Sequence, residues 1–248
     1  MSRPRIAIDR VDGQYTATLA DVDAGAELAR DLRHWMVGWR ATSASAQSLY
    51  IDCGTAQLMH AVWLHQVHAA SVDIATATTW GSWTARVSGL VVPTDWRVQR
   101  RKALAVFGTP VLARYARITC IPSGGYCAIG AAALWATVVD LPARLAAPYR
   151  WTVRQSVVQR ETLSGGMQVL VTGPPHLEIE WSAPPWTRAS GVIQTVLDIW
   201  ARDRAAWCVI DEQRGDPAHV YLVERVDELQ IAERQVTVDA RLVLREVL

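Results

Sequence analysis

Alternation of apolar and polar residues recurs along most of the chain, and this period of two is typical of half-buried β-strands. Between residues 48 and 139 the alternating and apolar runs are separated by polar or glycine-containing segments. We expect Gly54 to end the first strand, and residues 94–103 to form a polar, basic surface segment. The predicted strands are Ser48–Cys53, Leu58–Val67, Ser71–Thr76, Trp83–Val87, Gly89–Pro93, Val111–Ile121 and Cys127–Val139. The first two thirds of the chain are therefore predicted to be mainly β.

The later part of the chain repeats this pattern with one interruption. Ser190–Arg202 carries apolar residues at spacings of three and four, which predicts a helix with one apolar face and Ser190 as its N-cap. The strands predicted around it are Tyr149–Ser156, Gln168–Thr172, Leu177–Trp181, Ala206–Asp211, His219–Val223 and Gln235–Val247. The pattern predicts a second β-sandwich or β-barrel domain with one helix.

Proline, glycine and alanine mark the expected boundaries. Residues 1–30 contain a short alternating segment and are predicted to be an N-terminal arm or an edge strand. Two prolines and several alanines without periodicity lie within 141–148, so we place the end of the first domain there. The predicted organisation is an arm over 1–30, a β-sandwich over 31–147 and a second β domain over 148–248.

Composition narrows the functional classes. The chain has 248 residues, half of them hydrophobic and a fifth charged, which is typical of a soluble globular protein of one or two domains. The formal net charge is +1 and no dense basic stripe is present, which argues against nucleic-acid binding. Apolar runs are too short to cross a bilayer, and the N-terminus has no secretory signal pattern, so no membrane insertion is expected.

Candidate catalytic and metal-binding groups are sparse. The sequence has no glycine-rich phosphate loop and no nucleophile elbow, so we expect no enzyme activity and no cofactor. His60 and His68 would share one strand face and His65 the other, which is poor geometry for a metal site. Asp52 suits a loop cap or a cation, but no acidic cluster surrounds it, so no metal is expected. The four cysteines form no CxxC pair, and we expect them to be buried and reduced, although Cys120 and Cys127 flank a turn and a disulfide between them stays open.

Tryptophan is the unusual residue of this chain, with twelve Trp against one Phe. Four aromatic residues are predicted to lie in or beside loops, where they could stack on the apolar face of a sugar ring. The competing interpretation is that indoles fill sandwich cores and subunit contacts. The candidate carbohydrate-binding residues are Trp80, Trp83, Trp96 and Tyr126.

The order of features from Leu49 to Pro142 resembles the galactose-binding-like (discoidin-type) jelly roll. A strand ending in Asp52-Cys53-Gly54 leads into an apolar strand, a polar loop and a tryptophan. An aromatic and basic strand, a Gly124-Gly125 turn and an apolar strand opened by Ile129-Gly130 follow. The resemblance implies a sandwich that displays loops for binding, which points toward recognition or assembly.

The last hundred residues resemble the terminal domain of distal or minor tail proteins from long-tailed bacteriophages. The likeness is carried by Leu177–Trp181, Val192–Trp200, Trp207–Asp211, Tyr221–Val223 and Leu242–Val247. It implies a structural component of the tail tip that assembles into a ring with itself, contacts tube and hub proteins, and resides in the virion after synthesis in the host cytoplasm. The alternative function is a carbohydrate-binding module that mediates adsorption to host surface glycans, and an enzyme ranks last.

Overall fold

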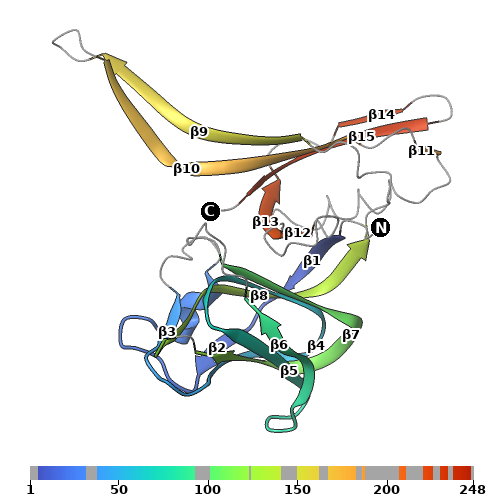
Figure 1. Cartoon of the computed structure of the whole chain (residues 1–248). Helices are drawn as coiled ribbons and strands as arrows, with labels where there is room; N and C mark the ends of the chain where they lie inside the picture. The colour runs from blue at the N-terminus through green and yellow to red at the C-terminus, as the bar shows by residue number, and fades with distance from the viewer. Residues whose placement is uncertain are drawn as a thin grey trace. The chain divides into compact units, whose positions relative to one another are not determined.

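The computed structural model of this chain divides it into two compact units, which are Met1–Leu141 with Cys208–Val220, and Pro142–Trp207 with Tyr221–Leu248. In the first unit the structure describes residues 5–31, 38–92, 101–122 and 124–140. In the later part of the chain it describes the strands within 150–161, 167–182, 186–187, 207–210, 220–225, 230–233 and 237–246. The described chain is mainly β, as the alternation predicts (Figure 1).

Unit 1 is an antiparallel sandwich of two sheets. In one sheet the strand order is β2, β4, β7, β5 and β6, and in the other it is β7, β4, β8, β1 and β12, with β3 paired to β8. The bounds are β1 Arg5–Val11, β2 Gln14–Ala17, β3 Trp39–Ala41, β4 Gln47–His68, β5 Ser71–Ala77, β6 Thr84–Val91, β7 Lys102–Ile121, β8 Cys127–Asp140 and β12 Trp207–Ile210. The predicted jelly-roll-type sandwich is confirmed for this unit.

Two long strands, β4 and β7, belong to both sheets. The first half of β4 pairs with β2 and the second half with β8, while β7 runs alongside both halves. The pairing register shifts between Asp52 and Gln57, where Gly54 adopts a φ of +74°. The prediction that Gly54 ends a strand was wrong, because glycine at positive φ here accommodates a bulge that bends a continuous strand.

The bounds of two other predicted segments were also wrong. β7 already begins at Lys102, so the end of the predicted 94–103 surface segment is strand, and the lone lysine is buried. One strand, β6 (Thr84–Val91), covers most of the predicted segments Trp83–Val87 and Gly89–Pro93, and Gly89 within it has a φ of +65°. Pro93 lies outside the described residues. The pairing of β5 with β6 has register shifts, and such irregular pairing lets the strand continue through Gly89.

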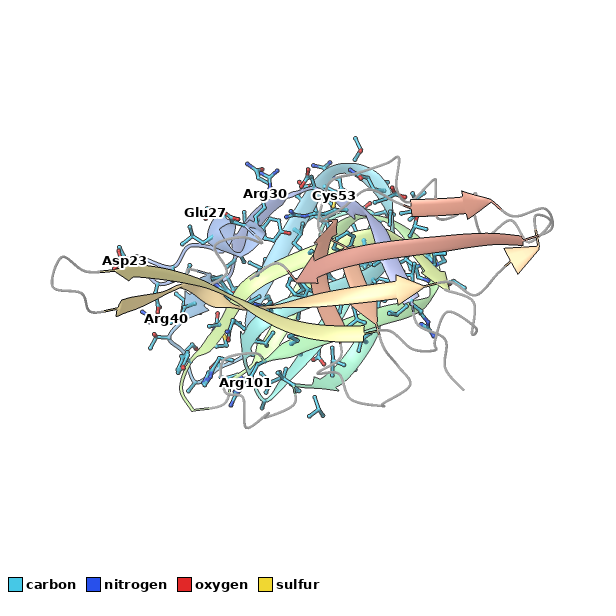
Figure 2. The ribbon with its side chains drawn as sticks, turned by 90° about the horizontal axis from the view of Figure 1, so that it is seen from above. Asp23, Glu27, Arg30, Arg40, Cys53 and Arg101 are labelled. Atoms are coloured by element: carbon cyan, nitrogen blue, oxygen red, sulfur yellow. The ribbon has the colours of Figure 1, made fainter. Side chains whose placement is uncertain are left out.

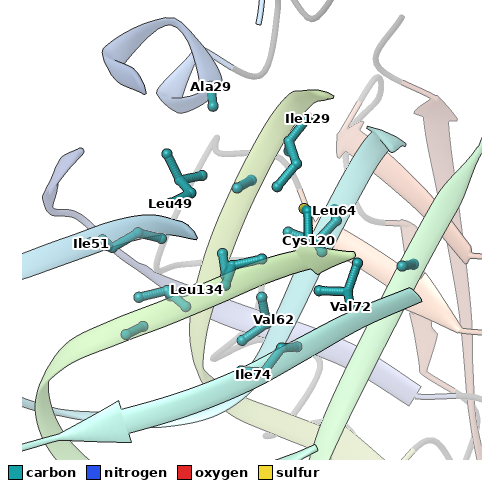
Figure 3. Packing of buried hydrophobic residues seen from close by; sticks show 14 of the residues in the cluster. Ala29, Leu49, Ile51, Val62, Leu64, Val72, Ile74, Cys120, Ile129 and Leu134 are labelled. Carbon is teal, nitrogen blue, oxygen red and sulfur yellow. The ribbon is translucent and has the colours of Figure 1, made fainter. Parts of the chain in front are cut away.

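The core of unit 1 lies between the two sheets. Leu49 and Ile51 come from the first sheet, and Ile129 and Leu134 from β8 in the second (Figure 3). All four side chains are fully buried, and each such aliphatic contributes about 1.5–3 kcal/mol by leaving water. Alternation in β4 therefore decides which residues face outward, and these are Tyr50 and Asp52.

The described cysteines are part of this core. Cys53, Cys120 and Cys127 are buried and free. Burial raises the pKa of Cys53 to about 11, so its thiol stays protonated at neutral pH. A hydrogen bond between the thiols of Cys120 and Cys127 raises the pKa of the first and lowers that of the second. These thiols behave as small hydrophobic groups, as the sequence predicts.

The N-terminal segment is integrated into the sandwich. β1 pairs with β8 on one side and with β12 on the other, so the predicted arm or edge strand is an interior strand. Tyr15 in β2 donates a hydrogen bond of 2.9 Å from its hydroxyl to the carbonyl of Ala132. Figure 2 shows Asp23, Glu27 and Arg40 around the short 3-10 helix η1 (Ala26–Arg30), where Arg40 also pairs with Asp21 at 2.6 Å. Strand pairing and these side-chain contacts hold residues of the 1–30 segment, which the sequence predicted to be an arm or an edge strand, within the sandwich.

The described strands of unit 2 form an antiparallel sheet around β15. β15 pairs with β10 on one side and with β11, β13 and β14 elsewhere, and β9 pairs with β10. The bounds are β9 Arg150–Glu161, β10 Met167–Ser182, β11 Trp186–Thr187, β13 Val220–Arg225, β14 Gln230–Glu233 and β15 Thr237–Glu246. The predicted helix Ser190–Arg202 lies outside the described residues. Across the part of the chain that is described, no helix has the length and apolar character needed to cross a bilayer.

Candidate functional site

Four aromatic side chains meet on the outer face of the first sheet of unit 1. Tyr50 comes from β4 and Tyr115 from β7, at positions that alternate with the buried Ile51 and Ala116. Trp80 and Trp83 come from the connection between β5 and β6. We call the group formed by Tyr50, Trp80, Trp83 and Tyr115 the aromatic platform.

The turn between β5 and β6 presents the two indoles. The Ser82 amide donates to the Thr79 carbonyl at 3.1 Å, and Gly81 between them has a φ of +92°. Glycine is the residue that takes this conformation without strain, and its place in the four-residue turn is the one that requires positive φ in a type II turn. Trp80 therefore sits at the tip of the hairpin.

Small residues on β5 make room for the indoles to lie back over the sheet. Ala75 pairs with Arg117 of β7, and Ala77 pairs with Tyr115, so both alanines share the outer face with the platform. Both are about 95% buried despite facing outward. Because β7 lies between β5 and β4, an indole that reaches Tyr50 must extend across β7. Larger side chains on β5 would obstruct that path.

The rings of the platform are in mutual contact. Ring centroids lie 5.0 Å apart for Tyr50 and Trp80, 5.4 Å for Trp80 and Trp83, and 5.4 Å for Trp80 and Tyr115. The last two pairs are edge-to-face, a favoured arrangement for aromatic rings. Trp80 is nevertheless 55% exposed, whereas Trp39 and Trp135 are fully buried elsewhere in unit 1. The platform is therefore preassembled and open to solvent.

Two guanidinium groups border the platform. The Arg117 Cζ lies 4.9 Å from the Trp83 ring centroid, and the Arg114 Cζ lies 4.8 Å from that of Tyr115. Arg114 also forms a two-point ion pair with Asp52, at 2.8 Å from Nε to Oδ1 and 2.9 Å from the terminal nitrogen to Oδ2. The Gly54 amide donates to the same carboxylate at 2.8 Å. Polar groups thus surround an apolar surface.

The Arg114 hydrogen bonds hold the pKa of Asp52 below its usual value, and the Gly54 amide adds to this effect. A lowered folded-state pKa means that the ion pair stabilises the fold at neutral pH and that this contribution is lost as pH falls through the lowered pKa. Asp52→Asn should therefore weaken the fall in melting temperature between about pH 5 and about pH 2. At neutral pH the variant should lose no more than about 1 kcal/mol, since both groups are partly exposed. Identical acid profiles for variant and wild type would contradict the assignment.

The other predicted aromatic residues do not join the platform. Tyr126 stacks on His68, with centroids 4.0 Å apart and planes at 4°. Tyr126 lies in the connection between β7 and β8, next to the first residue of β5, because Ile121 at the end of β7 pairs with Ser71. The turn that carries Trp80 and Trp83 follows the last residue of β5. The length of β5 separates these ends by about 20 Å. Trp96, the fourth predicted residue, lies outside the described residues.

The histidines have separate surroundings. His60 accepts a hydrogen bond from the Val138 amide at 3.2 Å, and His65 is buried and stacked on Trp63. No group of three or more His, Cys, Asp or Glu side chains within the described ranges is placed to hold a metal ion.

Sequence reasoning missed Tyr50, Tyr115 and the two arginines. Tyr50 lies between the inward Leu49 and Ile51, and Tyr115 precedes the inward Ala116, so alternation alone places both rings outward. What the sequence lacked was the order of the strands, which brings residues 50, 80 and 115 together. The sequence therefore indicated that both tyrosine side chains point outward, but it did not indicate that they lie beside Trp80.

Comparison with known proteins gives neighbours among solved structures alone, since no family model and no curated protein matches this chain. The family 32 carbohydrate-binding module of NanJ from C. perfringens, in complex with galactose, is 18% identical at a TM-score of 0.44 and covers 52% of this chain and 98% of its own. The module of AlyQ, in complex with 4,5-unsaturated mannuronic acid, is 22% identical at 0.45 and covers 52% and 100%. Chitosan-binding module 1 of a chitosanase/glucanase from Paenibacillus sp. IK-5 is 19% identical at 0.43 and covers 50% and 96%. About half of this chain is thus similar to carbohydrate-binding modules along nearly their whole length.

Proposed function

We propose that unit 1 is a carbohydrate-binding module and that the aromatic platform is its binding surface. The observation that carries this proposal is the preassembled group of Trp80, Trp83, Tyr50 and Tyr115, in which Trp80 is exposed and the other three rings are partly exposed. One face of a pyranose ring presents C–H groups that pack on an aromatic ring, while its hydroxyl groups need polar partners at the rim. The rings of the platform provide the aromatic surface for the C–H groups. The Asp52–Arg114 pair and Arg117 provide polar partners for the hydroxyl groups.

The rigidity of the platform favours this use. Ring-to-ring contacts and the turn at Gly81 hold the indoles in place before any ligand arrives, so binding costs little side-chain entropy. An indole that is 55% exposed also leaves apolar area uncovered, and covering it with a sugar face is favourable. No chemical step is required of these groups, and the proposed role is recognition.

A glycan array with the full chain tests the proposal. Binding should appear for at least one class of oligosaccharide and should shift the tryptophan emission spectrum on titration in solution, because two indoles lie in the site. An array and solution titrations without binding to any glycan would contradict the proposal.

A second candidate function concerns the whole chain, as a structural protein of a phage tail tip that assembles into a ring with tube and hub proteins in the virion. It is supported by the strands β10, β12, β13 and β15, which overlap with the segments Leu177–Trp181, Trp207–Asp211, Tyr221–Val223 and Leu242–Val247 of the tail-protein resemblance. The segment Val192–Trp200 lies outside the described residues. The two functions are compatible, since a tail-tip protein can carry a glycan-binding module.

Ring assembly requires contacts that close between copies, and exposed strand edges are suited to this. The C-terminal strand β15 offers no such edge, because it is paired along both sides. Among the described strands of unit 2, β9 pairs with β10 alone and is the better candidate. Mass photometry of the purified chain should then show ring-sized particles. A strictly monomeric chain that never co-purifies with virions would contradict this role.

A further inference from the structure

Among the described arginines of unit 1, Arg117 differs from the others in what surrounds it. It lies directly opposite Tyr50 on β4 and Ala75 on β5, in the middle strand of the outer face. Its guanidinium group is 4.9 Å from the ring centroid of Trp83. The positive charge is thus held within the aromatic platform, next to the surface proposed to bind sugar.

The described carboxylates on this face, Asp52 and Asp73, have hydrogen-bond partners other than Arg117. Both carboxylate oxygens of Asp52 are bound by Arg114. Asp73, one row along β5, accepts from the Gly89 amide at 2.7 Å and from the Ser88 hydroxyl at 3.3 Å. Among the described residues Arg117 forms no ion pair, and its buried Nε donates to no acceptor. The guanidinium group therefore has unmet hydrogen-bonding capacity beside an exposed apolar surface.

We infer that the aromatic platform selects acidic sugars, in which a pyranose ring carries a carboxylate as in the hexuronic acids, and that Arg117 is the residue that recognises the carboxylate. This inference rests on the proposed carbohydrate-binding function. It adds the class of ligand and the residue that determines specificity.

The physical argument is one of geometry and solvation. Arginine is weakly hydrated and presents a planar fork of donors that matches a carboxylate in a two-point contact. Neighbouring rings partly exclude water from Arg117, which strengthens its attraction for an anion relative to an exposed arginine. A sugar ring packed on Trp80 and Trp83 would bring a ring substituent beside Trp83, where the guanidinium group lies. A neutral hydroxymethyl group at that position would gain only an ordinary hydrogen bond.

The experiment compares matched ligands by calorimetric titration of the full chain. Trimers of galacturonic and mannuronic acid are each paired with the fully methyl-esterified trimer, which keeps the ring and removes the charge. Any neutral array ligand is likewise paired with its counterpart carrying a C6 carboxylate. Wild type should bind the acid at least about tenfold more tightly than its ester, as expected for a charge-assisted contact, and added salt should narrow the difference.

Arg117→Gln should reduce that preference to within about twofold, because glutamine can still hydrogen-bond a neutral sugar but lacks the charge that binds the carboxylate. Arg117→Lys, which keeps the charge but not the planar fork, should retain part of the preference and serves if the glutamine variant does not fold. Arg40→Gln removes the same charge from β3, where Arg40 pairs with Asp21, and should keep the full preference.

The outcomes separate the two proposals. Equal affinity of wild type for acid and ester, or an unchanged preference in Arg117→Gln, overturns the inference and leaves carbohydrate binding standing. Binding to neither acidic nor neutral glycans overturns the proposed function itself and the inference with it.

Discussion

Trp80→Ala is expected to lower glycan affinity by about 30-fold, which corresponds to about 2 kcal/mol and is typical of a tryptophan at the centre of a binding surface. Trp80 contacts Tyr50, Trp83 and Tyr115, so its removal deletes the largest exposed ring and also the edge-to-face contacts that hold the others. Calorimetric titration with the best array ligand measures the change. The melting temperature should shift little, because the indole is 55% exposed.

The matched control for this variant is Tyr126→Ala. Tyr126 is an aromatic residue with an exposed fraction of 36%, but it stacks on His68 and lies in the connection between β7 and β8, near the other end of β5. Its removal should leave glycan affinity within about twofold of wild type, as expected for a side chain outside the interface. If Tyr126→Ala loses binding and Trp80→Ala keeps it, the binding surface is at the other end of the sandwich and the platform has no such role.

The largest expected effect on stability belongs to Trp39→Ala in the core. Trp39 is fully buried on β3, and its indole Nε1 donates to the Leu19 carbonyl at 2.8 Å. Deleting the ring leaves a cavity and an unsatisfied carbonyl, which together cost about 3–5 kcal/mol of the free energy of unfolding. Urea denaturation monitored by circular dichroism measures the loss.

Trp39→Phe separates the two contributions. Phenylalanine keeps most of the buried ring but cannot donate to Leu19, so the variant should lose about 1–3 kcal/mol, less than the alanine variant. Trp80→Ala, made for the binding experiment, gives the exposed comparison. Equal stability of Trp39→Ala and wild type would show that β3 does not contribute to the core as described.

The strands of unit 1 could be predicted because one face of each is buried. Leu49 and Ile51 alternate with Tyr50 and Asp52, and this pattern indicates both the strand and its orientation. Strand ends were harder, since Gly54 and Gly89 are equally compatible with a terminator and with a bulge in local sequence. Only pairing with β7 and with β5 distinguishes the two cases, and such pairing is tertiary information. The pairing of β1 with β12 is not visible in the sequence for the same reason.

The aromatic platform was predictable in part. Trp80 and Trp83 flank a glycine in a polar loop, and this local signal led to both. Tyr50 and Tyr115 lie 65 residues apart in sequence and meet the indoles only through the strand order β5, β7, β4. Tyr126 has a similar local sequence context, but it lies in the connection between β7 and β8, near the opposite end of β5. Loop position identified candidates, and topology decided which of them form a common surface.

The six residues between β5 and β6, Thr78 to Trp83, contain both indoles and none of the core cluster. Replacements, insertions or deletions in this hairpin tip would change ligand preference while the interior packing stayed the same. Residues 78–83 can thus be exchanged, by evolution or by design, while the strands of the sandwich stay unchanged. Diversification of this chain among related genomes should accordingly concentrate there and not in the long bent strands that build the sandwich.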